Sequence, residues 1–171
     1  MITNLPEQLI AQAESLLRDG VVNEASVRRA VSSAYYALFH LLIRDAVVNW
    51  KHADQHARLA RAFDHKRMKD ASMAILGEIG SASSQSSLAF PTAAGDTEQA
   101  LRFRLLTVAQ AFVDLQQARH RADYDLGEPF PPLDAAVDVA QARLGFVAWA
   151  EVRDEAPAQR YLCSLLFKDR P

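Results

Sequence analysis

The chain has 171 residues, half of them hydrophobic, so it is long enough to fold around a core and its composition is not that of a disordered protein. Its formal net charge of −2 argues against a protein that binds nucleic acid through a strongly positive surface. Any such contact would have to be local, or be made in a groove between two subunits. Glycine and proline are scarce, which favours helices.

The sequence gives no sign of a membrane or secreted protein. No apolar run is long enough to span a bilayer, and the start, MITNLPEQLI, lacks the basic and apolar regions of a signal peptide. The single cysteine, Cys163, cannot form an internal disulfide, and its apolar neighbours predict a buried thiol in a reducing compartment. We therefore expect a cytoplasmic protein without a membrane partner.

The first two helices have clear boundary signals. Asn4-Leu5-Pro6-Glu7 is typical of a helix start, and Gly20 of a helix end. Asn23 is the expected N-cap of a second helix that runs to about Trp50.

Residues 28–42 of that second helix, RRAVSSAYYALFHLL, are the most informative stretch of the chain. At about 100° per residue, one broad face is apolar and predicts a core. It comprises Val27, Val31, Ala34, Tyr35, Leu38, Leu41 and Leu42. The opposite side carries a polar line, defined as Arg29, Ser33, Tyr36, His40 and Arg44. These residue types favour specific hydrogen bonds, so the polar line faces either a cleft or partner subunit, or an ordinary solvated surface.

The next segment predicts shorter helices and a loop. Asp54 is the expected N-cap of a short helix, and a further helix covers Ala71–Ile79. His52 and His56 have the i, i+4 spacing of metal ligands, with His65 more distant, but no carboxylate or thiol completes a set, so we predict no metal and no cofactor. Residues 81–95 predict a flexible loop. The part of this segment before the loop, residues 51–69, is locally basic, which makes it either a solvated face or a contact for a phosphate backbone. Its basic residues are Lys51, Arg58, Arg61, Lys66, Arg67 and Lys69.

A long helix is expected from Asp96, which with Gln99 resembles a capping box. Its core stripe is regular and consists of Leu101, Leu105, Val108, Phe112 and Leu115. The next position on that stripe is Arg119, which would extend towards solvent, pair with Asp123 four residues on, or point into a cleft.

The last long helix is predicted over Leu133–Val152, followed by a short helix from Pro157 within a C-terminal part, residues 156–171. The expected inward residues of the long helix are Val137, Ala140, Leu144, Val147 and Ala148. With no internal repeat and no domain boundary, residues 1–171 predict a single all-α domain, an up-and-down four-helix bundle with additional short helices.

Two motifs resemble those of the HEPN superfamily, in particular its small stand-alone prokaryotic members. The first, an RAYYAxFH-like helix, reads here as Arg29 followed by Tyr35-Tyr36-Ala37-Leu38-Phe39-His40, with Val31-Ser32-Ser33 interrupting it. The second, an RxxxADY helix end, reads as Arg119-His120-Arg121-Ala122-Asp123-Tyr124. The resemblance covers roughly Leu5 to Val152.

The resemblance implies a helical bundle that forms a homodimer with its polar motif residues near the dimer cleft. Many HEPN proteins are metal-independent ribonucleases in which four to six residues separate an Arg from a following His; the cation stabilises the phosphorane and the imidazole moves a proton. Counting from Arg119, those positions hold Tyr124, Asp125 and Leu126. Other members pair with a minimal nucleotidyltransferase as toxin and antitoxin, and in some a tyrosine comparable to Tyr124 is modified with AMP.

Three hypotheses follow. The chain is a HEPN-like binding or effector module for nucleotide, RNA or a nucleotidyltransferase, an active ribonuclease with a rearranged site, or a purely structural bundle. The candidate catalytic residues are Arg119, Asp123, Tyr124 and His40. The candidate nucleotide- or nucleic-acid-binding residues are Arg29, Ser33, Tyr36, His56 and Arg121.

Overall fold

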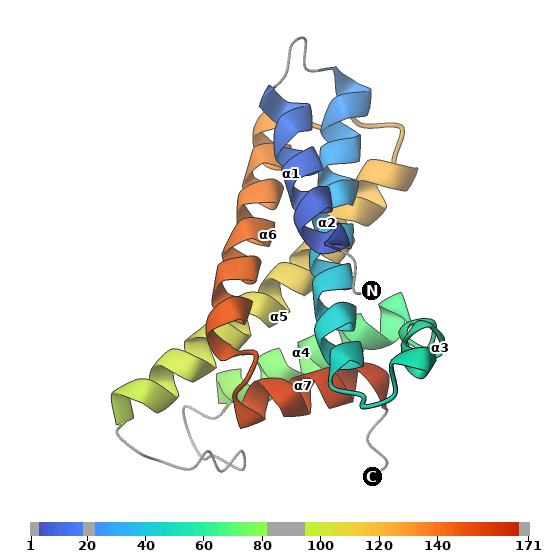
Figure 1. The fold of residues 1–171 in the computed structure, drawn as a ribbon. Coiled ribbons are helices and arrows are strands. Elements are labelled where there is room, and N and C mark those ends of the chain that lie inside the picture. The colour runs from blue at the N-terminus through green and yellow to red at the C-terminus, as the bar shows by residue number, and fades with distance from the viewer. Residues whose placement is uncertain (1–3, 19–22, 82–94, 168–171) are drawn as a thin grey trace. The chain divides into compact units, whose positions relative to one another are not determined.

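The computed structural model describes residues 4–18, 23–81 and 95–167. Over these residues the chain forms an all-α helical bundle with seven α-helices and no strand, which confirms the predicted fold class (Figure 1). The helices are α1 (Leu5–Arg18), α2 (Glu24–Val48), α3 (His56–Ala60), α4 (His65–Ser81), α5 (Gly95–Tyr124), α6 (Pro132–Val152) and α7 (Ala156–Leu166), with a 3-10 turn, η1 (Ala53–Gln55), before α3. None of these helices is long and apolar enough to cross a membrane.

The helices are divided between two compact units. Unit 1 comprises residues 1–42 and 111–146, and unit 2 comprises residues 43–110 and 147–171. Since both divisions fall inside helices, α2, α5 and α6 each contribute one part to each unit. The expectation of a single domain remains a prediction.

Unit 1 contains α1, the first part of α2, the last part of α5 and the first part of α6, in up-and-down order (Figure 1). Side-chain hydrogen bonds join neighbouring helices: Ser33 Oγ to Gln12 Oε1 at 3.3 Å, and Arg143 Nη2 to Glu14 Oε1 at 2.6 Å. Every residue of the predicted core face of α2 is buried. Asn23 caps α2 as predicted, since its Oδ1 accepts a hydrogen bond from the Ser26 amide at 2.9 Å.

Unit 2 is built around contacts of α7 with α4 and a buried carboxylate. Tyr161 is fully buried, and its hydroxyl lies 2.8 Å from Ser72 Oγ. Asp45 is also buried, and it accepts hydrogen bonds from Trp149 Nε1 at 2.8 Å and Arg44 Nε at 3.0 Å. The carboxylate is thus paired, as a buried charge requires.

The predicted inward face of α6 is wrong. Val137, Leu144 and Val147 are 53–61% exposed and Ala140 is exposed too, while Ala148 alone of the five predicted residues is buried. The helix buries a different face, made of Ala135, Val139, Ala142, Gly145, Trp149 and Val152. Because α6 is apolar around most of its circumference, the spacing of its large residues does not decide which side is inside.

Several smaller predictions also change. Asp54 lies inside η1, and the residue before α3 is Gln55, which makes no side-chain cap. The helix predicted from Ala71 begins at His65, and α5 begins at Gly95, so Asp96 lies within its first turn. Cys163 is exposed and not buried, since it lies on the outer side of α7. Gly20 and most of the predicted loop, residues 82–94, lie outside the described residues.

Two valines of α6 test its burial directly. Val139 is 6% exposed and Val137 is 59% exposed. We expect Val139→Ala to lower the free energy of unfolding by about 1–3 kcal/mol, because it leaves a cavity, and Val137→Ala to change it by less than about 0.5 kcal/mol. Urea denaturation of both variants measures this. Equal losses would contradict the burial pattern.

Candidate functional site: a cleft on α2 beside the end of α5

The polar line of α2 borders a cleft of about 300 Å³ in unit 1. Four of its five residues, Arg29, Ser33, Tyr36 and His40, line this cleft, and Arg44 belongs to unit 2. The remaining lining residues are Ser32 of α2 and Leu5, Leu9 and Gln12 of α1. Four of the five residues of the polar line therefore border a cleft, one of the two surroundings that the sequence left open.

The end of α5 joins this cleft through Arg119. Its Nη2 donates a hydrogen bond to the hydroxyl of Tyr36 at 3.1 Å, and its Nε lies 2.6 Å from Asp123 Oδ2 in an ion pair. The other oxygen of Asp123 accepts a 2.5 Å hydrogen bond from Ser32 Oγ. Of the three environments that the sequence left open for Arg119, the structure thus contains the pair with Asp123, and the guanidinium also contacts a cleft residue.

Tyrosine rings surround the Arg119 guanidinium. Its Cζ lies 5.5 Å from the ring centres of Tyr36 and Tyr124 and 6.0 Å from that of Tyr35, within range of cation–π attraction. Burial opposes the charged form, but Tyr36 and Asp123, with the other two tyrosines, outweigh it and raise the pKa of Arg119. Arg119 is therefore a permanent cation, and its charge is paired with that of Asp123.

Tyr36 connects the candidate residues of both helices. It accepts the hydrogen bond from Arg119, and its ring is stacked with that of His40 at a centre-to-centre distance of 6.2 Å. His120, by contrast, contacts Tyr124, with ring centres 5.0 Å apart. The cleft thus combines the exposed Arg29 with the imidazole of His40 and the hydroxyl of Tyr36, and arginine and tyrosine side chains commonly contact phosphates.

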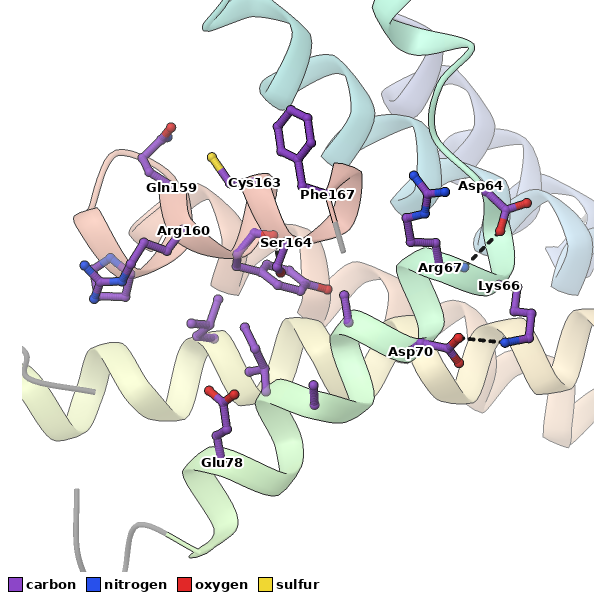
Figure 2. A pocket seen from close by; sticks show the side chains of 16 residues that line it. Asp64, Lys66, Arg67, Asp70, Glu78, Gln159, Arg160, Cys163, Ser164 and Phe167 are labelled. Carbon is purple, nitrogen blue, oxygen red and sulfur yellow. Dashed lines mark hydrogen bonds and ion pairs between the residues drawn. The ribbon is translucent and has the colours of Figure 1, made fainter. Parts of the chain in front are cut away.

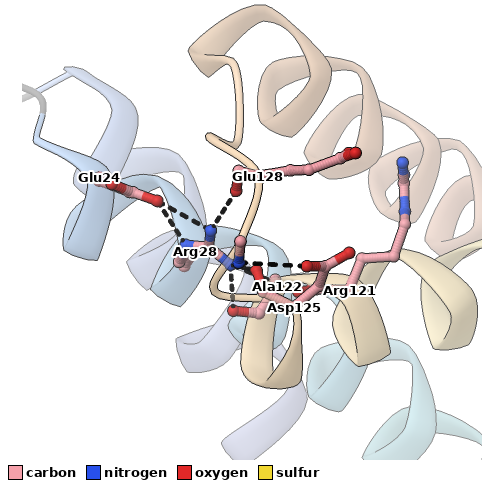
Figure 3. Close-up of polar contacts among 7 residues, drawn as sticks. Glu24, Arg28, Arg121, Ala122, Asp125 and Glu128 are labelled. Carbon is pink, nitrogen blue, oxygen red and sulfur yellow. Dashed lines mark hydrogen bonds and ion pairs between the residues drawn. The ribbon is translucent and has the colours of Figure 1, made fainter.

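The sequence does not predict the role of Arg28, which donates hydrogen bonds to backbone carbonyls at the end of α5 (Figure 3). Its Nη1 donates to the carbonyl oxygens of Ala122 at 3.0 Å and Asp125 at 2.8 Å, and more weakly to that of Arg121 at 3.3 Å. Its Nη2 donates to the carbonyl of Glu128 at 2.6 Å and to the carboxylate of Glu24 at 2.8 Å. Arg121 and Ala122 belong to the last turn of α5, and Asp125 and Glu128 follow it. Because the last carbonyls of a helix tend to lack partners, Arg28 acts as a cap for this helix end, supplied by another helix.

The other predicted residues have different surroundings. Arg121 lies with its Cζ 5.4 Å from the ring of Phe130 in unit 1. His56 belongs to unit 2, where its Nε2 lies 2.8 Å from the carbonyl oxygen of Trp50. In the basic segment, Lys66 pairs with Asp70 at 2.8 Å and Arg67 donates to the Leu166 carbonyl at 2.9 Å. Over the described residues, no three His, Cys, Asp or Glu side chains are placed to hold a metal ion.

Unit 2 contains a larger cavity of about 1050 Å³, bordered by α4 and α7 (Figure 2). Ala71, Ala74, Ile75 and Leu105 give it an apolar interior, and charged residues such as Asp64, Lys66 and Arg160 lie around it. Three acidic and three basic residues line the cavity, so its lining has no net charge.

Comparisons with protein-family models, with curated proteins and with solved structures give no match for this chain. The function must therefore be inferred from the geometry of the cleft and from its sequence motifs.

The role of Arg28 can be tested by substituting it and its neighbour Arg29 separately. We expect Arg28→Met to lower the free energy of unfolding by about 2–4 kcal/mol, because it leaves several carbonyls and Glu24 without their charged donor. Arg29→Met, which removes the same charge from the exposed neighbour, should change stability by less than about 0.5 kcal/mol. Chemical denaturation of the two variants measures the difference, and similar values would refute the capping role.

Asp138 of α6 is a carboxylate of unit 1 whose pKa is raised in the folded protein. Burial raises its pKa to about 6, and Asp134 and Asp114 add to this while Arg121 opposes it. Its Oδ2 is shielded from solvent and has no hydrogen-bond partner among the described residues. Since the pKa is higher in the folded state than the ordinary 3.8, protonation favours folding: the stabilisation is complete below pH 3.8 and is lost as the pH rises through about 6.

Replacing this carboxylate by an amide should therefore stabilise the fold at neutral pH. We expect Asp138→Asn to gain about 1 kcal/mol at pH 7.5, a modest value because solvent screens this part-exposed group, and the gain should disappear towards pH 4. Thermal denaturation at several pH values measures it. Asp134→Asn is the control, with a smaller gain, and a gain for Asp138→Asn that is independent of pH would contradict the assignment.

Proposed function

We propose that this protein binds a nucleotide or RNA in the cleft of unit 1, as a HEPN-like binding or effector module. The observation that carries the proposal is that Arg29, Tyr36 and His40 line one cleft while Arg119 of the other motif holds the hydroxyl of Tyr36. The two motifs, which are 83 residues apart at this contact, thus contribute to one place.

The dimensions and chemistry of the cleft support a ligand of this class. Its volume, about 300 Å³, is at the lower end of ligand cavities and suits one nucleotide unit better than a large molecule. Arg29 supplies an exposed positive charge for a phosphate, and the Tyr36 and His40 rings supply a surface for a base or sugar.

The state of Arg119 favours binding over cleavage. Transition-state stabilisation requires a cation directed at the developing phosphorane charge. The charge of Arg119 is offset by Asp123 at 2.6 Å, and its Nη2 donates to Tyr36. The HEPN resemblance supports the same class of ligand, and on that resemblance we also propose a homodimer and a minimal nucleotidyltransferase as partners.

Calorimetry with AMP and ATP, together with fluorescence anisotropy with a labelled 12-nucleotide RNA, tests this proposal. We expect Arg29→Met to weaken binding about tenfold, because it removes one charged contact to phosphate. The matched control is Arg153→Met, which removes another exposed arginine, in unit 2, and should leave affinity unchanged.

The proposal fails if none of these ligands binds at millimolar concentration, or if both arginine variants weaken binding equally. The same RNA, analysed on a denaturing gel, also distinguishes the ribonuclease alternative. Cleavage that His40→Ala abolishes would replace binding by catalysis as the function of the cleft.

A further inference from the structure

Tyr124 presents an aromatic ring to solvent beside the cleft. We propose that this ring stacks on an unpaired base, so that the site takes single-stranded RNA and not a duplex; this inference rests on the function proposed above. Tyr124 is 63% exposed, whereas Tyr35 of the same cluster is completely buried.

The exposed ring of Tyr124 is held in place by its neighbours. The Arg119 guanidinium lies 5.5 Å from its ring centre, and the His120 ring lies 5.0 Å away at an angle of 50°. The turn that carries Tyr124 is fixed in addition by Arg28, which binds the carbonyls of Ala122 and Asp125 on either side of it. A ring that is already positioned loses little freedom when a base stacks on it.

The ring of Tyr124 and the cleft are close enough to bind one RNA strand together. The ring centres of Tyr36 and Tyr124 both lie 5.5 Å from the same carbon, Arg119 Cζ. A nucleotide whose phosphate or sugar occupies the cleft would therefore place its own base, or the next one, over Tyr124. Bases in a duplex are stacked on one another and cannot lie flat on a protein ring, whereas unpaired bases stack readily on aromatic side chains.

The charges around Tyr124 also disfavour a duplex. Asp123 and Asp125 flank it in the chain, so both of its sequence neighbours are acidic. Duplex binding depends mainly on neutralising closely spaced phosphates with several cations, and the two carboxylates beside Tyr124 oppose this. A stacking contact is much less dependent on positive charge.

The test compares a fluorescein-labelled 12-nucleotide RNA of mixed sequence with the same strand annealed to its complement. For the wild-type protein we expect at least tenfold tighter binding of the single strand. Tyr124→Ala should weaken that binding between about 5- and 100-fold, while Tyr124→Phe, which keeps the ring, should bind as the wild type does.

Phe103→Ala is the matched control, because Phe103 is another aromatic residue of α5 and is 70% exposed. It should leave affinity unchanged, and circular dichroism should show the same helical fold for all variants. If the single strand binds but Tyr124→Ala binds equally well, or if the duplex binds as tightly, the stacking inference is wrong and the cleft proposal stands. If neither RNA nor nucleotide binds the wild-type protein, both are wrong.

Discussion

The guanidinium of Arg28 fixes the end of α5 against α2, and the candidate site depends on this contact. An α-helix leaves its last carbonyl groups without internal partners, and here a side chain from another helix supplies the donors. Glu24, one turn earlier on α2, compensates the charge of Arg28, whose side chain is only 12% exposed. Arg119, Asp123 and Tyr124 lie within the last two turns of α5, so their positions relative to α2 follow from this cap.

A network of four side chains continues from the capped end of α5 to the cleft. Ser32 and Tyr36 of α2 contact Asp123 and Arg119 of α5, so α2 contributes the two hydroxyl groups and α5 the two charged groups. Because the positive and negative charges are paired within the network, its main effect is to hold Tyr36 and Tyr124 in position. This arrangement suits recognition by ring surfaces better than chemistry driven by a free cation.

The sequence predicts the buried face of a helix where apolar and polar side chains separate cleanly. On α2 and α5 the apolar stripes are bordered by polar residues, so the helical period alone identifies Leu38 or Phe112 as buried. On α6 the stripe containing Val137 and Leu144 is exposed, and the buried face includes Ala135, Ala142 and Gly145. A Cβ on Gly145 would lie 3.4 Å from Leu38 and Ala111, so small residues permit this close approach, which hydrophobic spacing alone does not reveal.

For the site, contacts between residues close in the sequence could be predicted, whereas contacts between distant residues could not. The polar line and the pair of Arg119 with Asp123 follow from helical spacing, because their members are three or four residues apart. The role of Arg28 does not, since its acceptors are backbone carbonyls 93–100 residues away that carry no side-chain signature. In the sequence Arg28 and Arg29 stand side by side, and only Arg29 falls on the polar line. On a helix they point about 100° apart, so one is directed at the end of α5 and the other at the cleft, and the same residue type performs two different tasks.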